Sequence, residues 1–304
     1  MIHIFIINSN AGSEKFSASL RNHLSNIKNI RYYILHTRKN QRERELVRQV
    51  MELFEGEYIR IYSCGGSGTF CNILNGVSDY SNVEFAFYPK GFTNDFLKVF
   101  NEDRQYFDDI DNLIDGDVVP IDYIQTNHGV CLNTFSIGLD SVQVKKMDEY
   151  RLGSVFGRDV PYIAGLIYAI FSSKPEKFEI SIDGEDFSCT TSQIFFGNGG
   201  TIGGSLNFER NPEITDGMAV YSVCNAMNTA RMIPCLINLM RKKNEKIASF
   251  SRYGHARSIT VRRSDGLPFS MDFDGELQPE YREWKAEIVR RGINFVIPKG
   301  VSVR

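Results

Sequence analysis

The residues best suited to chemistry form a glycine-rich segment, residues 64–76 (CGGSGTFCNILNG). The segment follows a predicted strand and opens a predicted helix. Glycines let a backbone turn tightly and approach a ligand without a Cβ clash. A helix N-terminus offers N–H groups and a positive dipole end to a phosphate. The Gly-Lys-Ser/Thr element of a P-loop is missing, so a plain tight turn stays open as the alternative.

Two further polar loops also follow predicted strands. They are residues 8–13 (NSNAGS) and residues 89–96 (PKGFTNDF). Each alone is equally typical of a loop that ends in a helix N-cap. In an open α/β sheet, ligands bind beyond the carboxyl ends of the strands. Three such loops at one sheet edge therefore predict a nucleotide site.

The elements that must position these loops alternate between strand and helix. Strands are predicted at 3–8, 31–36, 58–63 and 83–88, and helices at 13–27, 41–54 and 70–77. In the second helix, Val47, Val50, Met51 and Phe54 follow the i, i+3, i+4, i+7 pattern of an amphipathic helix. The alternation predicts a parallel sheet in an α/β domain.

After about residue 120 the pattern changes to short β-rich runs. They lie at 121–126, 130–136, 178–183, 192–196, 218–223, 258–263, 269–273 and 285–289, with helical segments only at 161–171 and 228–242. This spacing predicts a mostly antiparallel β domain.

The composition is that of an ordinary globular chain. The 304 residues predict about two domains, and 42% hydrophobic with 24% charged residues excludes disorder and collagen-like fibres. The longest apolar run, 162–171, is too short for the roughly 20 residues of a bilayer span. The start MIHIFII lacks signal-peptide features. Six cysteines without CxxC spacing indicate neither zinc nor a disulfide framework, which favours a reducing cytoplasm.

The charge is unevenly distributed along the chain. Residues 231–304 hold 15 Lys and Arg against 8 Asp and Glu, a local charge of +7, whereas the first 230 residues carry −9. A basic C-terminal third could face an anionic surface. A mixed-charge solvated face is the simpler interpretation, because the basic residues are dispersed.

Taken together, the loops resemble the diacylglycerol kinase catalytic-domain superfamily, in its bacterial soluble lipid kinase branch. The three loops above are similar to the family's Asn-Pro-x-Ser/Ala-Gly, Gly-Gly-Asp-Gly-Thr and Pro-x-Gly-Thr-x-Asn-Asp-Phe motifs. Later segments are similar to its Gly-x-Asp, Asp-Gly-x-Leu and Asp-Gly-Glu elements, at 137–140, 215–218 and 273–276, and residues 196–204 resemble its Asn and Gly-Gly stretch. The similarity keeps its order along nearly the whole chain.

The resemblance implies a fold and a reaction. The fold would be an N-terminal Rossmann-like α/β nucleotide-binding domain, residues 1–120, and a C-terminal antiparallel β-sandwich domain, residues 121–304, whose last strands could return to the first. The active site would lie in the interdomain cleft. The reaction would be ATP-dependent phosphorylation of diacylglycerol or a related lipid. Such transfer needs positioning, Mg²⁺ and a carboxylate that takes the hydroxyl proton.

The resemblance also implies roles for individual residues. Asp274 or Glu276 would be the general base, Asp95 would belong to an acidic network, and Lys98 would replace a stabilising Arg. Asp216 would bind Mg²⁺ with the backbone carbonyls of Glu213 and Met218. The nucleotide would contact Asn8, Asn10, Gly12, Thr37, Gly65, Gly66, Ser67, Gly68, Thr69, Asn72 and Thr93. Without the family, turns and N-caps would explain most of these residues.

Three departures from the family pattern keep alternatives open. Ser67 replaces the Asp of Gly-Gly-Asp-Gly-Thr, Phe92 replaces a Thr, and Ser9 replaces a Pro. Loss of the acid at position 67 removes charge where electrostatics supply most of the catalysis. One alternative is an impaired relative that binds nucleotide or lipid as a regulator. Another is an NAD kinase-like enzyme, which the Asn94-Asp95-Phe96 and Asp274-Gly275-Glu276 elements disfavour.

A lipid substrate requires contact with a membrane surface. Residues 162–171 are apolar almost all round, which is more typical of a core helix than of a lipid-facing lip. The basic C-terminal third could add attraction to anionic headgroups. We expect a cytoplasmic, peripheral enzyme that binds no nucleic acid, and the family makes a homodimer plausible.

Overall fold

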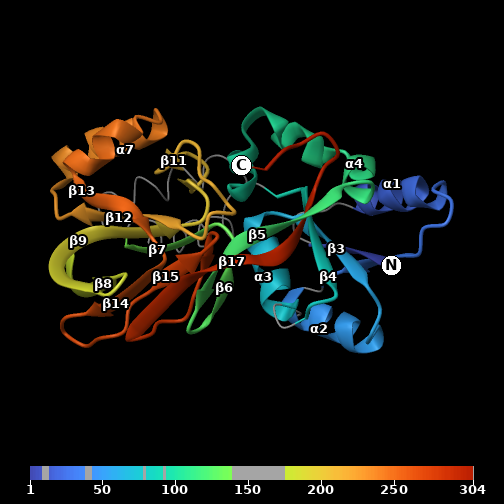
Figure 1. The fold of residues 1–304 in the computed structure, drawn as a ribbon, viewed down its shortest axis with the longest axis horizontal. Helices are drawn as coiled ribbons and strands as arrows, with labels where there is room; N and C mark the ends of the chain where they lie inside the picture. The colour runs from blue at the N-terminus through green and yellow to red at the C-terminus, as the bar shows by residue number, and fades with distance from the viewer. Residues whose placement is uncertain (9–13, 38–42, 78–79, 92–93, 139–174, 304) are drawn as a thin grey trace. The chain divides into compact units, whose positions relative to one another are not determined.

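The computed structural model describes residues 1–8, 14–37, 43–77, 80–91, 94–138 and 175–303 (Figure 1). The chain separates into two compact units. Unit 1 comprises Met1–Ile121 and Arg291–Arg304, and unit 2 comprises Asp122–Arg290. The predicted fold class, α/β followed by mostly antiparallel β, is confirmed.

Unit 1 is built on a parallel sheet. Its strands pair in the order β2-β1-β3-β4, and Phe295 of β17 pairs in parallel with Phe85 of β4. The elements in chain order are β1 (Ile2–Ile7), α1 (Glu14–Ser25), β2 (Tyr32–His36), α2 (Glu43–Leu53), β3 (Ile59–Gly65), α3 (Ser67–Val77), β4 (Val83–Pro89), the 3₁₀ segment η1 (Phe96–Asp108) and α4 (Ile110–Ile114).

Burial explains why these segments adopt strand and helix. Every residue of β1 and β3 is buried, as expected for central strands of a parallel sheet that is covered on both faces. Helix α2 turns Val47, Val50 and Met51 inward, which are three of the four positions predicted from periodicity. The parallel strands all end at the same edge of the sheet, and the candidate loops begin there.

Unit 2 is antiparallel throughout its described strand pairs. The order is β16-β15-β7-β9-β8-β14-β17, and β12 pairs with both β9 and β13. The strands are β5 (Asp117–Thr126, which begins in unit 1), β6 (Gly129–Cys131), β7 (Thr134–Gly138), β8 (Glu176–Ile182), β9 (Glu185–Gly197), β10 (Thr201–Ile202), β11 (Leu206–Asn207), β12 (Ala219–Asn225), β13 (Ser251–Ala256), β14 (Ser258–Arg263), β15 (Met271–Phe273), β16 (Glu276–Leu277) and β17 (Glu283–Ile297, which ends in unit 1). Helix α7 (Thr229–Met240) and the 3₁₀ segment η2 (Asn244–Ser249) precede β13.

Several boundaries differ from the sequence prediction. Helix α3 begins at Ser67, three residues earlier than expected, so ten of the thirteen residues of the glycine-rich segment are helical. The predicted strand 130–136 is two strands, because the backbone N–H groups of Leu132, Asn133 and Thr134 donate to the carboxylate of Asp274. The strand predicted at 285–289 extends over Glu283–Ile297. The helix predicted at 161–171 lies outside the described residues.

None of the helices in the described part of the chain has the length and apolar character needed to cross a bilayer.

Candidate functional site

The glycine-rich turn and the loop after β4 pack directly against each other in unit 1. The carbonyl oxygen of Gly65 accepts hydrogen bonds from the N–H groups of Lys90 and Gly91, both at 2.9 Å. A Cβ added to Gly91 would lie 2.2 Å from the Cα of Gly66. Glycine at position 91 is therefore required by the close approach of two backbones, and the two loops form one surface.

The loop after β1 joins the same cluster through a buried carboxylate. Asn8 donates its side-chain amide to Glu43 Oε1 at 2.9 Å and to Thr69 Oγ1 at 3.0 Å. Glu43, at the start of α2, also accepts from the amide of Asn72 at 3.4 Å. These contacts bring together Asn8, Thr69 and Asn72, all of which the motifs had indicated. Glu43 had not been indicated.

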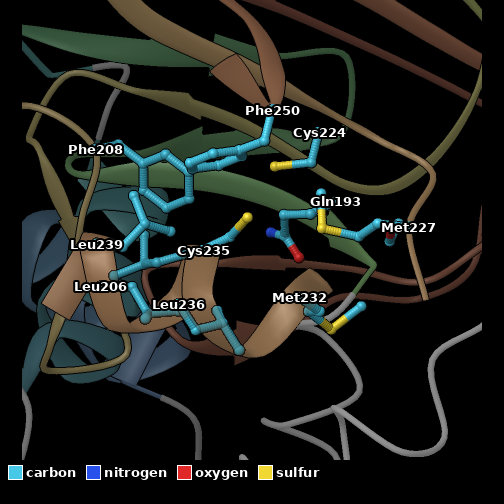
Figure 2. Close-up of a pocket in the computed structure, with 12 residues that line it drawn as sticks. Gln193, Leu206, Phe208, Cys224, Met227, Met232, Cys235, Leu236, Leu239 and Phe250 are labelled. Carbon is cyan, nitrogen blue, oxygen red and sulfur yellow. The ribbon is translucent and has the colours of Figure 1, made fainter. Parts of the chain in front are cut away.

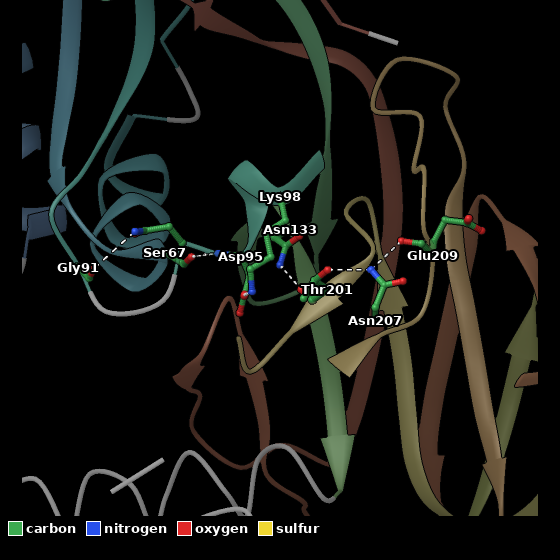
Figure 3. A network of polar contacts seen from close by, with 9 residues as sticks. Ser67, Gly91, Asp95, Lys98, Asn133, Thr201, Asn207 and Glu209 are labelled. Carbon is green, nitrogen blue, oxygen red and sulfur yellow. Dashed lines mark hydrogen bonds and ion pairs between the residues drawn. The ribbon is translucent and has the colours of Figure 1, made fainter. Parts of the chain in front are cut away.

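Ser67 and Asp95 connect the start of α3 to the start of η1 (Figure 3). The backbone N–H of Asp95 donates to Ser67 Oγ at 3.2 Å, and both residues are buried. The Asp95 carboxylate accepts from Lys98 Nζ at 2.6 Å. Asp95 occupies the N-cap position of η1, but its side chain makes no capping hydrogen bond. The pair places a cation and an anion beside the glycine-rich turn.

The geometry of the turn suits an anion. The first helical hydrogen bond of α3 is donated by Phe70 to the carbonyl of Gly66. The N–H groups of Ser67, Gly68 and Thr69 therefore lie at the positive end of an eleven-residue helix. Gly66 and Gly68 stay partly accessible while their neighbours are buried. This arrangement can bind phosphate through the backbone.

The remaining predicted nucleotide contacts fall into two groups. Thr37 is buried beside β1, where its N–H donates to the carbonyl of Ile7 at 3.0 Å. It thus lies at the carboxyl edge of the sheet. Asn10, Gly12 and Thr93 lie outside the described residues, and so does Asp140 of the predicted Gly-x-Asp element.

In unit 2 the Asp-Gly-Glu element forms the turn between β15 and β16. Asp274 and Gly275 have φ values of 51° and 81°, as in the tight turns that favour Asp-Gly. The Asp274 carboxylate is 6% exposed and accepts three backbone N–H groups at 2.8–2.9 Å, whereas Glu276 is exposed. Of the two candidate bases, Asp274 therefore holds the backbone together and Glu276 faces outward.

A buried acid, Asp122, forms hydrogen bonds with the predicted metal loop, residues 213–218. Asp122 is fully buried, accepts the N–H of Gly217 at 2.6 Å and donates its own N–H to the carbonyl of Ile214 at 2.8 Å. Asp216 is exposed, and one of its oxygens accepts the N–H of Met218 at 2.9 Å.

The residues of this loop fit a hard cation. An exposed carboxylate in a pinned loop, close in sequence to the carbonyls of Glu213 and Met218, offers the oxygen donors that Mg²⁺ prefers. Within the described residues, no group of three His, Cys, Asp or Glu side chains gathers into a metal cluster. Any cation here would therefore use backbone oxygens and water beside the carboxylate.

A polar chain in unit 2 ends near this loop (Figure 3). Asn133 donates to the carbonyl of Thr201 at 2.9 Å, and Asn207 donates to Thr201 Oγ1 and to the carbonyl of Glu209, both at 3.0 Å. His255 lies 3.6 Å from the Glu209 carboxylate. The hydrogen bond with His255 is the main reason that the pKa of Glu209 is lowered to about 2, and Glu209 in turn raises the pKa of His255.

Unit 2 also contains an apolar pocket beneath α7 (Figure 2). The cavity has a volume of about 40 Å³. Two thiols project into it, and burial raises the pKa of Cys224 to about 12 and also raises that of Cys235. Both thiols are therefore neutral and act as apolar lining. The other lining residues are Ser192, Gln193, Ile202, Leu206, Phe208, Met227, Met232, Leu236, Leu239 and Phe250.

Three features of the site were missed from the sequence. Glu43 and Asp122 are single acids outside any motif; Glu43 is the first residue of α2 and Asp122 lies within β5. The pocket combines residues from β9 to η2 that are far apart in the chain, and only the apolar periodicity of 228–242 hinted at a helix over a core.

Comparisons with known proteins bear on the family. Residues 3–126 match the family described as "Diacylglycerol kinase catalytic domain". Two Staphylococcus aureus proteins named "Putative lipid kinase", from strains MRSA252 and JH9, are each 26% identical over 173 residues. The match covers 55% of this chain and 55% of each relative, so this chain spans about half the length of the curated relatives it matches.

Solved structures share the fold. A "putative diacylglycerol kinase" from Bacillus anthracis str. Sterne superposes with a TM-score of 0.72 at 19% identity, covering 99% of this chain and 96% of that one. A second Bacillus anthracis diacylglycerol kinase structure gives a TM-score of 0.69 at 17% identity, with 99% and 98% coverage. The resemblance predicted from the motifs is thus confirmed over residues 3–126, which match the diacylglycerol kinase catalytic-domain family.

Proposed function

We propose that this protein transfers the γ-phosphoryl group of ATP to the hydroxyl of diacylglycerol or a related lipid. The observation that carries the proposal is the convergence of Asn8, the Gly65–Gly66 turn, Gly91 and Asp95 at one edge of the parallel sheet. This cluster lies inside the segment that matches the kinase family. A helix N-terminus flanked by glycines is suited to the phosphates of a nucleotide.

The acids divide the remaining work. Glu276 is our candidate for the general base that accepts the proton of the attacking lipid hydroxyl, because it is exposed while Asp274 is buried under three N–H donors. The lipid oxygen bonds to the γ-phosphorus, and ADP departs with the electrons of the broken bond. Asp216 and neighbouring carbonyls would hold Mg²⁺, which neutralises phosphate charge when bound.

The apolar pocket supports a lipid as the phosphoryl acceptor. We propose that it accommodates part of an acyl chain, because all its lining residues except Ser192 and Gln193 are aliphatic, aromatic, thioether or neutral thiol groups. Cys235→Phe would fill it, and Cys189→Phe, at a half-buried thiol outside the lining, is the matched control. We expect KM to rise for long-chain diacylglycerol in the first variant only.

The direct test is transfer of radiolabel from ATP to a panel of lipids in mixed micelles, with free NAD as a further acceptor. We expect label in one lipid, loss of label in Glu276→Gln, and retention in Glu287→Gln, which makes the same change at another exposed acid of unit 2. Absence of label in every lipid, from protein with an intact circular dichroism spectrum, would refute the proposal. Label in NAD alone would favour the NAD kinase-like alternative.

Ser67 is the specific observation that favours a second candidate, a weakly catalytic regulator. Ser67 is 5% exposed, and its hydroxyl accepts the N–H of Asp95. A carboxylate at position 67 would be buried next to the Asp95 acid, so it would need a cation or a proton. Ser67→Asp separates the candidates: a large gain in Mg²⁺-dependent turnover marks the natural chain as impaired, and unchanged or lower turnover supports a working kinase built around serine.

A further inference from the structure

Helix α7 exposes an apolar stripe that the core of unit 2 does not use. Ile233 and Ile237 are each 41% exposed and Met240 is 49% exposed. Their i, i+4, i+7 spacing places them along one line of the helix surface. Figure 1 shows α7 in orange on the outside of unit 2, above β12 and β13. We call these three residues the α7 stripe.

Basic residues precede and follow the stripe along the chain. Between residues 229 and 249 the only acid is Glu245. In the part of the chain that the structure describes, no basic residue of this segment forms an ion pair, whereas Arg252 and Arg263 nearby are each paired. The basic flank of the stripe consists of Arg231, Arg241, Lys242, Lys243 and Lys246, of which all but Lys243 are exposed.

We infer that the α7 stripe and its basic flank dock unit 2 onto an anionic lipid bilayer. A short helix with exposed Ile and Met beside Lys and Arg can bury its apolar side chains among lipid tails while its cations meet phosphate groups. Each basic residue near an anionic membrane contributes about 1 kcal/mol of attraction. The stripe supplies depth of insertion and the flank supplies selectivity for charge.

A second copy of the chain fits this surface less well than a bilayer does. A two-fold interface would bring the same patch from both copies together. The basic flanks would then face each other without acids to offset them, and like charges across an interface are unfavourable. Charge complementarity therefore selects an anionic partner, and the narrow apolar stripe selects one with an accessible hydrocarbon layer.

Docking through α7 would also serve the proposed lipid substrate. The inner face of the same helix lines the apolar pocket with Met232, Leu236 and Leu239. This consequence rests on the proposed function, because it assumes that the pocket takes an acyl chain from the membrane. The docking itself does not depend on turnover and is measurable without ATP.

The test is flotation of the full chain with vesicles of phosphatidylcholine, with and without 30% phosphatidylglycerol, in the absence of nucleotide. We expect binding only to the anionic vesicles, lost at high salt because of screening. Lys242→Glu/Lys246→Glu should lower the partition coefficient about 30-fold or more, the equivalent of about 2 kcal/mol. Arg21→Glu/Arg48→Glu, two exposed cations of unit 1, is the charge-matched control and should retain binding.

Apolar variants complete the design. Ile233→Gln/Ile237→Gln should lower binding at least about tenfold, whereas Leu53→Gln, at an exposed apolar residue of α2, should not. Equal vesicle binding by the α7 variants and wild type would overturn the inference. So would variants that change the oligomeric state in sedimentation but leave vesicle binding unchanged. Phosphorylation of monomeric short-chain lipid by the α7 variants would show that docking, not catalysis, was altered. If no lipid is phosphorylated but anionic vesicles still bind through α7, the proposed function fails and the docking surface stands.

Discussion

Replacing Asp274 with asparagine separates a structural role of this acid from a catalytic one. The carboxylate accepts N–H groups from Leu132 on one oxygen and from Asn133 and Thr134 on the other. An asparagine keeps one acceptor oxygen and places an NH₂ group against the third donor. Asparagine also tolerates the positive φ of 51° at this position, so backbone strain does not confuse the comparison.

The cost follows from the count of contacts. One buried N–H loses its acceptor, which costs about 1–3 kcal/mol, and two charge-assisted hydrogen bonds become neutral, which costs about 1 kcal/mol more in total. We therefore expect the free energy of unfolding of unit 2 to fall by about 2–4 kcal/mol. With a urea m-value of about 3 kcal/mol/M, the unfolding midpoint would drop by about 1 M.

The protein provides its own probe for this measurement. Trp284 is the single tryptophan of the chain, is fully buried, and packs edge-on against Phe273 at 5.4 Å. Its fluorescence therefore reports unfolding around β15 and the Asp274 turn. Glu287→Gln changes an exposed carboxylate to an amide and should change the free energy of unfolding by less than about 0.5 kcal/mol. If Asp274→Asn were as stable as wild type yet lost all lipid phosphorylation, the structural reasoning would be refuted and Asp274 would be the base.

Three further predictions concern unit 1. Burial lowers the pKa of His3 to about 4, so the unfolded chain binds the proton more readily below pH 6.5. The free energy of unfolding is therefore highest above pH 6.5 and falls, by up to about 3 kcal/mol, as the pH drops toward 4. Chemical unfolding measured from pH 7.5 to 4 should show this decrease in wild type and a smaller decrease in His3→Gln. Arg60→Met should lower the free energy of unfolding in urea by about 3–5 kcal/mol, because it leaves the buried Glu84 carboxylate without its ion-pair partner at 2.5 Å. A loss under 1 kcal/mol would contradict this. Gly91→Ala should weaken binding of a fluorescent ATP analogue at least about tenfold, because the added Cβ would force the loop after β4 away from the Gly65–Gly66 turn. Unchanged affinity would mean that the spacing of these two loops does not affect nucleotide binding.

Local patterns predicted most of the fold because the strands and helices are locally consistent. The continuous apolar run of β1 and the i, i+3, i+4 pattern of α2 each specify one element and one buried face. The break between β6 and β7 could not be predicted from residues 129–138 themselves. It is imposed by Asp274, more than 130 positions later in the chain.

The candidate site was predicted to the extent that its residues belong to glycine-rich loops. Asn8, Thr69 and Asn72 were expected near one another, and they share contacts. The residue that connects them, Glu43, has no motif around it, since its role depends on the side-by-side packing of helices α2 and α3. A single acid acquires this function only through tertiary contacts, which spacing along the chain does not encode.

The four acids that match family motifs therefore differ in what their presence indicates. Asp95, Asp216, Asp274 and Glu276 all match family motifs, which from sequence alone favours an active kinase over an impaired one. Asp274, however, is needed to hold the β6–β7 break, and an inactive relative would keep it for folding. Asp95 is paired with Lys98. Asp216 and Glu276 are both exposed, so their substitution tests catalysis without removing a buried carboxylate. Turnover that survives Glu276→Gln would exclude Glu276 as the general base and return that role to Asp274.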